Sequence, residues 1–233
     1  MEKGNFESFV SELSSSDGEL LRYPQRAFEF ENAGSVLVDQ STDSVATIVW
    51  DSEVFLAHYL DSLTSDRLSK KCLLELGAGT SLGSIVALRL GGVVVVQELE
   101  EVVAESRKRV EQNEGAARFV SGRWGSELAS KILEESELRS FDWIVMSDVL
   151  YQPEHFSDLN SVLVGCSKLG TQVVVAHEAR RLDLSPYFSS LSEVFECERV
   201  VWYEVCKQSN EDFENEKIQT TSFFLHHLRR VVD

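Results

Sequence analysis

Hydrophobic and polar residues alternate along residues 26–41, on either side of a turn at Asn32-Ala33-Gly34. This period of two predicts a β-hairpin. From residue 72 onward, short apolar runs alternate with segments whose apolar residues recur at helical spacing. Such an alternation predicts a parallel sheet covered by helices. The expected strands are 72–76, 93–97, 117–122, 141–146 and 171–177. The expected helices are 49–63, 81–90, 100–113, 155–168 and 184–195. Asp51 is the expected N-cap of the first of these helices.

Two further segments, 197–206 and 220–231, alternate apolar and polar residues near the end of the chain. They predict an antiparallel pair at the sheet edge, joined by a solvated acidic loop over 209–217. We therefore expect a polar N-terminal segment over 1–25, followed by a single α/β domain over 26–233. The hairpin would be an extension of that domain, covering about residues 26–50.

The chain is strongly acidic, since 22 Lys and Arg stand against 39 Asp and Glu and give a net charge of −17. This charge repels nucleic acid and anionic membranes. It suits a partner with a basic, Lys-containing segment, such as a chaperone. The alternative is that the acidic charge only keeps the protein soluble. There is no visible signal peptide, no apolar run of roughly 18 residues and no CxxC spacing. We expect a cytoplasmic monomer without a metal site, and a nuclear location as well is the alternative.

A glycine loop, Gly77-Ala78-Gly79, follows the first expected strand of the sheet and opens the next helix. Glycines let a ligand approach the backbone closely, although a tight turn without a ligand is the alternative. Glu98 ends the next strand, 21 residues after Gly77, at the spacing at which an acid reaches ribose hydroxyls. Glu75 would repel a pyrophosphate but attract the ammonium and sulfonium of S-adenosylmethionine. Because Leu82 stands where a third glycine would be, S-adenosylmethionine is favoured over a dinucleotide.

Further candidates follow the third and fourth expected strands. Trp124 can stack on an adenine or fill a gap under a loop. Trp50, upstream of the sheet, can cap a cofactor or belong to the core. Ser147, Asp148 and Tyr151 follow the fourth strand, so they lie at the carboxyl edge of the sheet, where α/β folds bind their ligands. An ordinary turn is the alternative for this D-x-x-Y pattern.

Together these residues resemble methyltransferase family 16, the seven-β-strand protein methyltransferases without a SET domain. The segments "VWDSEVFLAHYL", "LLELGAGTSLGSIVA", "SGRWG" and "SDVLYQPEHF" stand in the family's order and spacing, and the resemblance covers about residues 26–228. It implies a Rossmann-like class I S-adenosylmethionine-dependent methyltransferase fold. Such a fold has a seven-stranded mixed sheet with an antiparallel C-terminal strand, here with an N-terminal hairpin. Ser81 departs from the glycine that the family usually has, and we expect its Cβ to narrow the approach to the loop.

The resemblance also implies a role for each candidate. Asp148 and Tyr151 match the family's signature at the acceptor site, so they would be the catalytic pair. The remaining candidates would surround the cofactor: Trp50 at its flank, Gly77, Ala78 and Gly79 along its methionine part, Glu98 at the ribose, Trp124 over the adenine, and Ser147 at the fourth strand.

The expected reaction is an in-line displacement of a methyl group from a sulfonium, for which a protein mainly supplies position and desolvation. A Lys ε-ammonium, with a reference pKa of about 10.4, must first lose a proton. Asp148 would orient the ammonium, the proton would leave to water, and Tyr151 would form a wall that attracts the cation. A protein lysine is the expected acceptor, and the alternative acceptors are a protein Arg or His or a small molecule. A different alternative is that the chain is a cofactor-binding module without turnover. Nucleobase enzymes have two prolines where this chain has Val149-Leu150.

Overall fold

A computed structural model describes residues 23–178, 182–208 and 218–232, so most of the expected polar segment over 1–25 and the acidic loop over 209–217 lie outside the described residues. The strands are β1 (Gln25–Phe30), β2 (Gly34–Asp39), β3 (Cys72–Leu76), β4 (Val93–Glu98), β5 (Arg118–Ser121), β6 (Phe141–Ser147), β7 (Ser167–Glu178), β8 (Phe195–Gln208) and β9 (Ile218–Arg230). The α-helices are α2 (Asp51–Leu68), α3 (Leu82–Arg89), α4 (Val103–Gln112), α5 (Ser126–Ser136), α6 (Phe156–Cys166) and α7 (Ser185–Ser190). Two short 3-10 helices are η3 (Val45–Thr47) and η4 (Pro153–His155).

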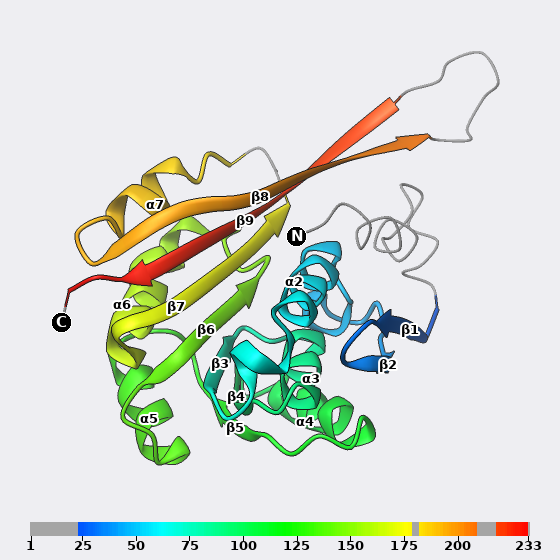
Figure 1. The fold of residues 1–233 in the computed structure, drawn as a ribbon, viewed down its shortest axis with the longest axis horizontal. Helices are drawn as coiled ribbons and strands as arrows, with labels where there is room; N and C mark the ends of the chain where they lie inside the picture. The colour runs from blue at the N-terminus through cyan, green and yellow to red at the C-terminus, as the bar shows by residue number, and fades with distance from the viewer. Residues whose placement is uncertain (1–22, 179–181, 209–217, 233) are drawn as a thin grey trace.

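The larger sheet has seven strands in the order β5-β4-β3-β6-β7-β9-β8 (Figure 1). The pairs from β5 to β7 are parallel, and β9 runs antiparallel to both β7 and β8. The smaller sheet is the β1–β2 hairpin, in which Phe30 pairs with Gly34. The prediction of a seven-stranded mixed sheet with an antiparallel C-terminal strand and an N-terminal hairpin is therefore confirmed.

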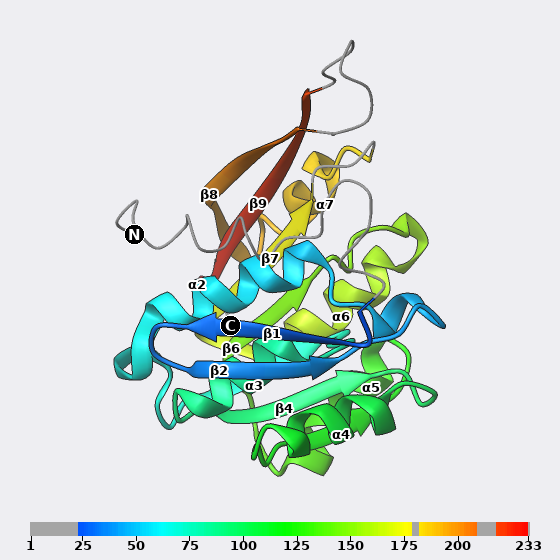
Figure 2. The ribbon, with the colours of Figure 1, turned by 90° about the vertical axis from the view of Figure 1, so that its right-hand side faces the viewer.

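Two hydrophobic cores lie on opposite faces of this sheet. Side chains of a buried strand alternate between the faces, so Leu73 of β3 joins one core and Leu74 the other. The first core holds α2, α3 and the β1–β2 hairpin, and the second holds α5, α6 and α7 (Figures 1 and 2). None of the helices in the described part of the chain is both long and apolar enough to cross a membrane.

The strand order places the carboxyl ends of β3 and β6 side by side. The chain leaves β3 toward α3 on one face and leaves β6 toward α6 on the other, which makes this the switch point of the topology. Open α/β sheets bind ligands in the crevice at such a point. The glycine loop and the loop that carries Asp148 both lie here.

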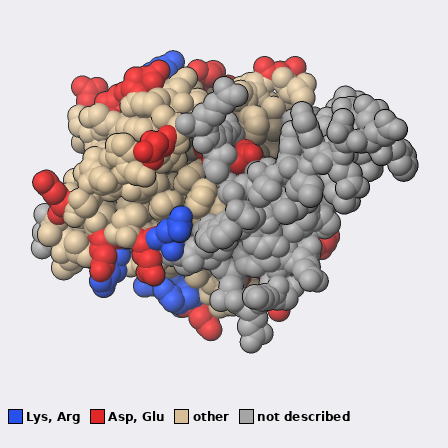
Figure 3. All heavy atoms as spheres, turned by 90° about the horizontal axis from the view of Figure 1, so that it is seen from above, with Lys and Arg blue, Asp and Glu red and all other residues tan. Residues whose placement is uncertain are grey.

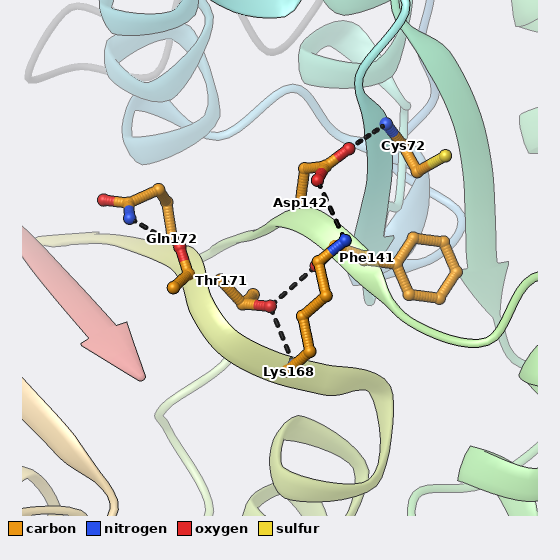
Figure 4. A network of polar contacts seen from close by, with 7 residues as sticks. Cys72, Phe141, Asp142, Lys168, Thr171 and Gln172 are labelled. Atoms are coloured by element: carbon orange, nitrogen blue, oxygen red, sulfur yellow. Dashed lines mark hydrogen bonds and ion pairs between the residues drawn. The ribbon is translucent and has the colours of Figure 1, made fainter. Parts of the chain in front are cut away.

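A polar network ties the opposite, amino ends of the central strands together (Figure 4). The Asp142 carboxylate accepts a hydrogen bond from the Cys72 backbone N–H at 3.0 Å and lies 3.1 Å from the Lys168 ammonium. The Thr171 hydroxyl donates to the Phe141 carbonyl at 2.7 Å. These contacts join β3, β6 and β7 at the edge away from the glycine loop, so they stabilise the sheet rather than build the site.

Several elements extend beyond their predicted bounds: α2 reaches Leu68 instead of 63, and β7 begins at Ser167 instead of 171. Three further differences concern α5, α7 and the N-cap of α2. Helix α5 was not predicted, although Leu128, Ala129 and Ile132 have the spacing of a buried helical face. Helix α7 ends at Ser190 instead of reaching 195, because a turn follows and the buried Phe195 already belongs to β8. Trp50, not Asp51, occupies the N-cap of α2, and its side chain makes no capping hydrogen bond.

Candidate active site

The glycine loop between β3 and α3 has a backbone that side chains would disturb. Gly77 and Gly79 have positive φ angles of 62° and 49°. A Cβ on Gly77 would lie 3.0 Å from Val149 Cγ1 and 3.3 Å from Trp124 Cζ2. Both the angles and the close neighbours require glycine. The same contacts show that the glycine loop, Trp124 and the loop after β6 meet, as their positions at strand ends predicted.

The end of β4 fixes the shape of this loop. The Gln97 carboxamide oxygen accepts hydrogen bonds from the Gly77 N–H at 3.2 Å and from the Trp124 indole N–H at 3.0 Å. The Ser106 hydroxyl donates to the Gly79 carbonyl at 2.7 Å. Gln97 therefore joins two candidate cofactor segments, although nothing in the sequence pattern distinguished it from a buried strand residue.

Glu98, the acid expected at the ribose, is 6% exposed. Its two carboxylate oxygens accept hydrogen bonds from the Gly79 N–H at 2.8 Å and the Leu99 N–H at 2.7 Å. Burial raises its pKa above the ordinary value, while these two backbone bonds lower it. Glu98 is thus held against the glycine loop, and its contact with a ribose stays a prediction.

Glu75 lies behind the glycine loop, between β3 and α3, and is 1% exposed. One carboxylate oxygen accepts hydrogen bonds from the Ser84 N–H, at 2.8 Å, and from the Ser84 hydroxyl. The other oxygen has no hydrogen-bond partner among the described residues. Burial, with a further contribution from the nearby Glu53 carboxylate, raises the pKa of Glu75 to about 8. A raised pKa favours the protonated carboxyl, so its predicted attraction to the cofactor would act only when the cofactor's positive charges favour the ionised form.

Glu53, on the first turn of α2, is a site residue that the sequence reasoning missed. It is 4% exposed. Its carboxylate accepts hydrogen bonds from the Thr80 hydroxyl at 2.6 Å and from the Leu82 N–H at 2.8 Å. Burial raises its pKa to about 7. The available signal was a second acid on the first turn after Trp50, directly before the mostly apolar residues 54–60.

The segment before α2 also reaches the glycine loop. Trp50 is partly buried, and its indole N–H donates to the Val45 carbonyl at 2.8 Å. The Ala46 carbonyl oxygen lies 3.4 Å from the position that a Cβ on Gly79 would take. The structure therefore places the Trp50 segment beside Gly79, and the flanking of a cofactor by Trp50 stays a prediction.

The loop after β6 has a buried part that anchors it and a part that solvent can reach. Val149 and Leu150 are each 6% exposed and pack into the second core. Ser147 and Asp148, before them, are partly exposed, and Tyr151 is 54% exposed. The apolar pair thus anchors the loop, while its polar neighbours keep access to solvent. Asp148 has a positive φ of 52°, and its N–H donates to the Ala176 carbonyl at 2.9 Å.

A groove of about 870 Å³ lies beside this loop, between α6 and α7. Pro153, Phe156, Leu182 and Tyr187 contribute to its lining. The groove borders the acceptor side rather than the glycine loop. Within residues 23–178, 182–208 and 218–232, no three His, Cys, Asp or Glu side chains come together as metal ligands.

Comparisons with known proteins agree with this arrangement. Residues 31–194 match the model of a family described as lysine methyltransferase. The protein N-lysine methyltransferase METTL21A of Mus musculus is 29% identical over 183 residues, which are 76% of this chain and 81% of that protein. METTL21A of Xenopus tropicalis is 29% identical over 160 residues, 66% of this chain and 71% of that protein.

Among solved structures, the SAM-dependent methyltransferase from Agrobacterium tumefaciens superposes with a TM-score of 0.60 at 12% identity, over 89% of this chain and 70% of that one. This likeness concerns the fold, whereas the family match covers most of the sequence, including the glycine loop and the loop after β6. The chain therefore belongs to the lysine methyltransferase family.

Proposed function

We propose that this protein transfers a methyl group from S-adenosylmethionine to the ε-amine of a lysine in a protein substrate. The observation that carries the proposal is the meeting of two loops at the switch point of the sheet. Gly77 of the glycine loop lies directly against Trp124 and against Val149 of the Asp148–Tyr151 loop. A cofactor on the first loop would therefore present its methyl group near the second.

The residues present suit this cofactor. Glu75 and Glu98 are buried beside the glycine loop, and neither forms an ion pair with a Lys or Arg among the described residues. Burial raises the pKa of both carboxyls, so a ligand that carries positive charge would stabilise their ionised forms, whereas a pyrophosphate would not. S-adenosylmethionine supplies an ammonium, a sulfonium and a methyl group with its leaving group already attached. Gly77, Ala78 and Gly79 would hold its methionine part, with Trp50, Trp124 and Ser147 around it.

The acceptor side is built for positioning. Asp148 accepts a hydrogen bond from the incoming lysine ammonium and orients it along the line of attack. Because a neighbouring negative charge raises the pKa of an ammonium, Asp148 is a poor base, and the proton passes to water. The Tyr151 ring forms a wall that attracts the cation by its π face. The cofactor, when bound, would supply a methyl carbon in line with the nitrogen lone pair: the N–C bond would form as the C–S bond breaks, and S-adenosylhomocysteine would leave as a neutral thioether.

The charge of the molecule supports a basic protein substrate. Acidic side chains clearly outnumber basic ones in the sequence, with a net charge of −17, and the face in Figure 3 carries more red than blue atoms. We propose that the substrate presents its lysine in a basic segment, that a chaperone is one candidate partner, and that the enzyme works as a cytoplasmic monomer with access to the nucleus.

The test combines cofactor binding with transfer. Calorimetry should show binding of S-adenosylhomocysteine, and radiolabelled S-adenosylmethionine with a cell lysate should label protein bands. Heat-denatured enzyme is the control for labelling by other activities in the lysate. Cofactor binding without a labelled protein, across several lysates, would contradict the enzyme and leave a binding module.

A further inference from the structure

Ser81 is an unfavourable residue at its position in the glycine loop. Its φ is 64°, in the left-handed region, where a side chain with a Cβ is disfavoured and glycine is not. The residue is fully buried, and its hydroxyl has no hydrogen-bond partner among the described residues. Ser81 therefore contributes no side-chain hydrogen bond that would hold this conformation, and other groups must stabilise it.

The residues on either side of Ser81 bind one carboxylate. Glu53 accepts a hydrogen bond from the Thr80 hydroxyl at 2.6 Å and another from the Leu82 N–H at 2.8 Å. Glu53 comes from α2, so it bridges 27 residues to Thr80. Both of its bonds depend on the turn that Ser81 makes, because that turn sets the direction of the Thr80 side chain and the Leu82 N–H.

We infer that Glu53 is a positioning residue, which holds Ser81 in its left-handed conformation and thereby keeps the glycine loop in the shape that binds the cofactor. This inference rests on the proposed function for the identity of the ligand. It explains how the chain accommodates serine at a left-handed position that would suit glycine better. It also links the Trp50 segment to the loop, since α2 begins directly after Trp50.

The length of the Glu53 side chain, rather than its charge, should matter. Glu53→Gln keeps the length, and its carboxamide can accept from the Leu82 N–H and donate to the Thr80 hydroxyl. Glu53→Asp keeps the charge but is one methylene shorter, so it cannot reach both partners. We expect S-adenosylhomocysteine to bind about tenfold more weakly to Glu53→Asp and within about threefold of wild type to Glu53→Gln, as measured by calorimetry.

Ser81→Gly should rescue the shortened side chain. Glycine adopts the left-handed conformation without strain, so the Glu53→Asp/Ser81→Gly variant should bind S-adenosylhomocysteine within about threefold of wild type. Ser52→Ala is the matched control, because Ser52 is the neighbouring buried residue on α2 and its hydroxyl has no hydrogen-bond partner among the described residues. It should leave the affinity as it is.

Two results would overturn the inference: a Glu53→Gln variant that binds as weakly as Glu53→Asp, or a Ser81→Gly change that restores nothing. A wild-type chain that binds no S-adenosylhomocysteine would instead contradict the proposed function. The coupling between Glu53 and Ser81 is then measured without ligand, by urea unfolding of wild type, Glu53→Asp, Ser81→Gly and Glu53→Asp/Ser81→Gly. Glu53→Asp should destabilise the protein less with Ser81, where the released loop relieves the left-handed strain, than in the Ser81→Gly background, where there is no strain to relieve. Equal destabilisation in both backgrounds would again overturn the inference.

Discussion

Asp148 combines an unusual backbone with the chemistry that we assign to it. Its φ of 52° is uncommon outside glycine, although Asp and Asn tolerate it better than other residues. The conformation is fixed by a backbone bond to Ala176 and by the burial of Val149 and Leu150 on the next turn of the loop. Strained residues that the surroundings hold in place gather at functional sites, which agrees with a role in orienting the acceptor.

Replacing Asp148 should separate catalysis from cofactor binding. Asp148→Ala removes the acceptor for the lysine ammonium, so kcat/KM should fall by about 100-fold or more while the dissociation constant for S-adenosylhomocysteine stays within about threefold. Asp148→Asn is the matched control, since Asn tolerates this backbone conformation and keeps a hydrogen-bond acceptor. Its kcat/KM should lie between those of wild type and Asp148→Ala. A collapse of cofactor affinity in Asp148→Ala would make Asp148 a cofactor ligand.

The buried Glu75 should make stability depend on pH. Its pKa rises from 4.5 to about 8 in the folded protein, so folding favours the protonated carboxyl. Its stabilising contribution is fully present below about pH 4.5 and is lost as the pH rises through about 8. Glu75→Gln has a similar shape and does not titrate.

We therefore expect the free energy of unfolding, measured without cofactor, to fall for wild type relative to Glu75→Gln between about pH 5 and about pH 8.5. The comparison of the two proteins removes the effect of the histidines, which are the same in both. Parallel curves would show that Glu75 ionises normally in the folded state.

At the scale of elements, α5 and α6 pack without room for a further methyl group. A Cβ on Gly165 would lie 2.6 Å from the Cβ of Ala129. Gly165→Ala should therefore destabilise the protein by about 1–3 kcal/mol, despite the better helix propensity of Ala. Adding Ala129→Gly should recover part of the loss, which urea unfolding would measure. An equally stable Gly165→Ala protein would mean that the helices separate easily, and that α6 does not hold the loop before it firmly.

The predictions that succeeded and those that failed differ in the range of the interactions involved. Apolar runs and turn residues act locally, so they predicted the strands, the hairpin and the positions of the two loops. The meeting of those loops followed from the shared carboxyl edge of parallel strands. The role of Glu53 could not be predicted, because its bonds to Thr80 and Leu82 arise only when α2 packs beside α3. Helix α5 had a readable pattern and was simply not predicted.

At the scale of the whole molecule, the net charge of −17 should govern how a basic substrate arrives. Raising the ionic strength from about 0.1 M to about 1 M shortens the screening length from about 10 Å to about 3 Å. We expect KM for a basic protein substrate to rise severalfold while kcat changes little, because screening acts on encounter and not on the displacement. A KM that is independent of salt would mean that the acidity only serves solubility.

The central claim is that the acceptor is a lysine nitrogen, and mass spectrometry after transfer of an isotope-labelled methyl group tests it most directly. The protein would be incubated with the labelled cofactor and a lysate, with Asp148→Ala in parallel, and the labelled residue identified in peptides. The predicted result is a labelled lysine side chain with wild type and, at equal incubation, about a hundredth of that label or less with Asp148→Ala. A label found on arginine, histidine or a small molecule, with lysine unlabelled, would contradict the account.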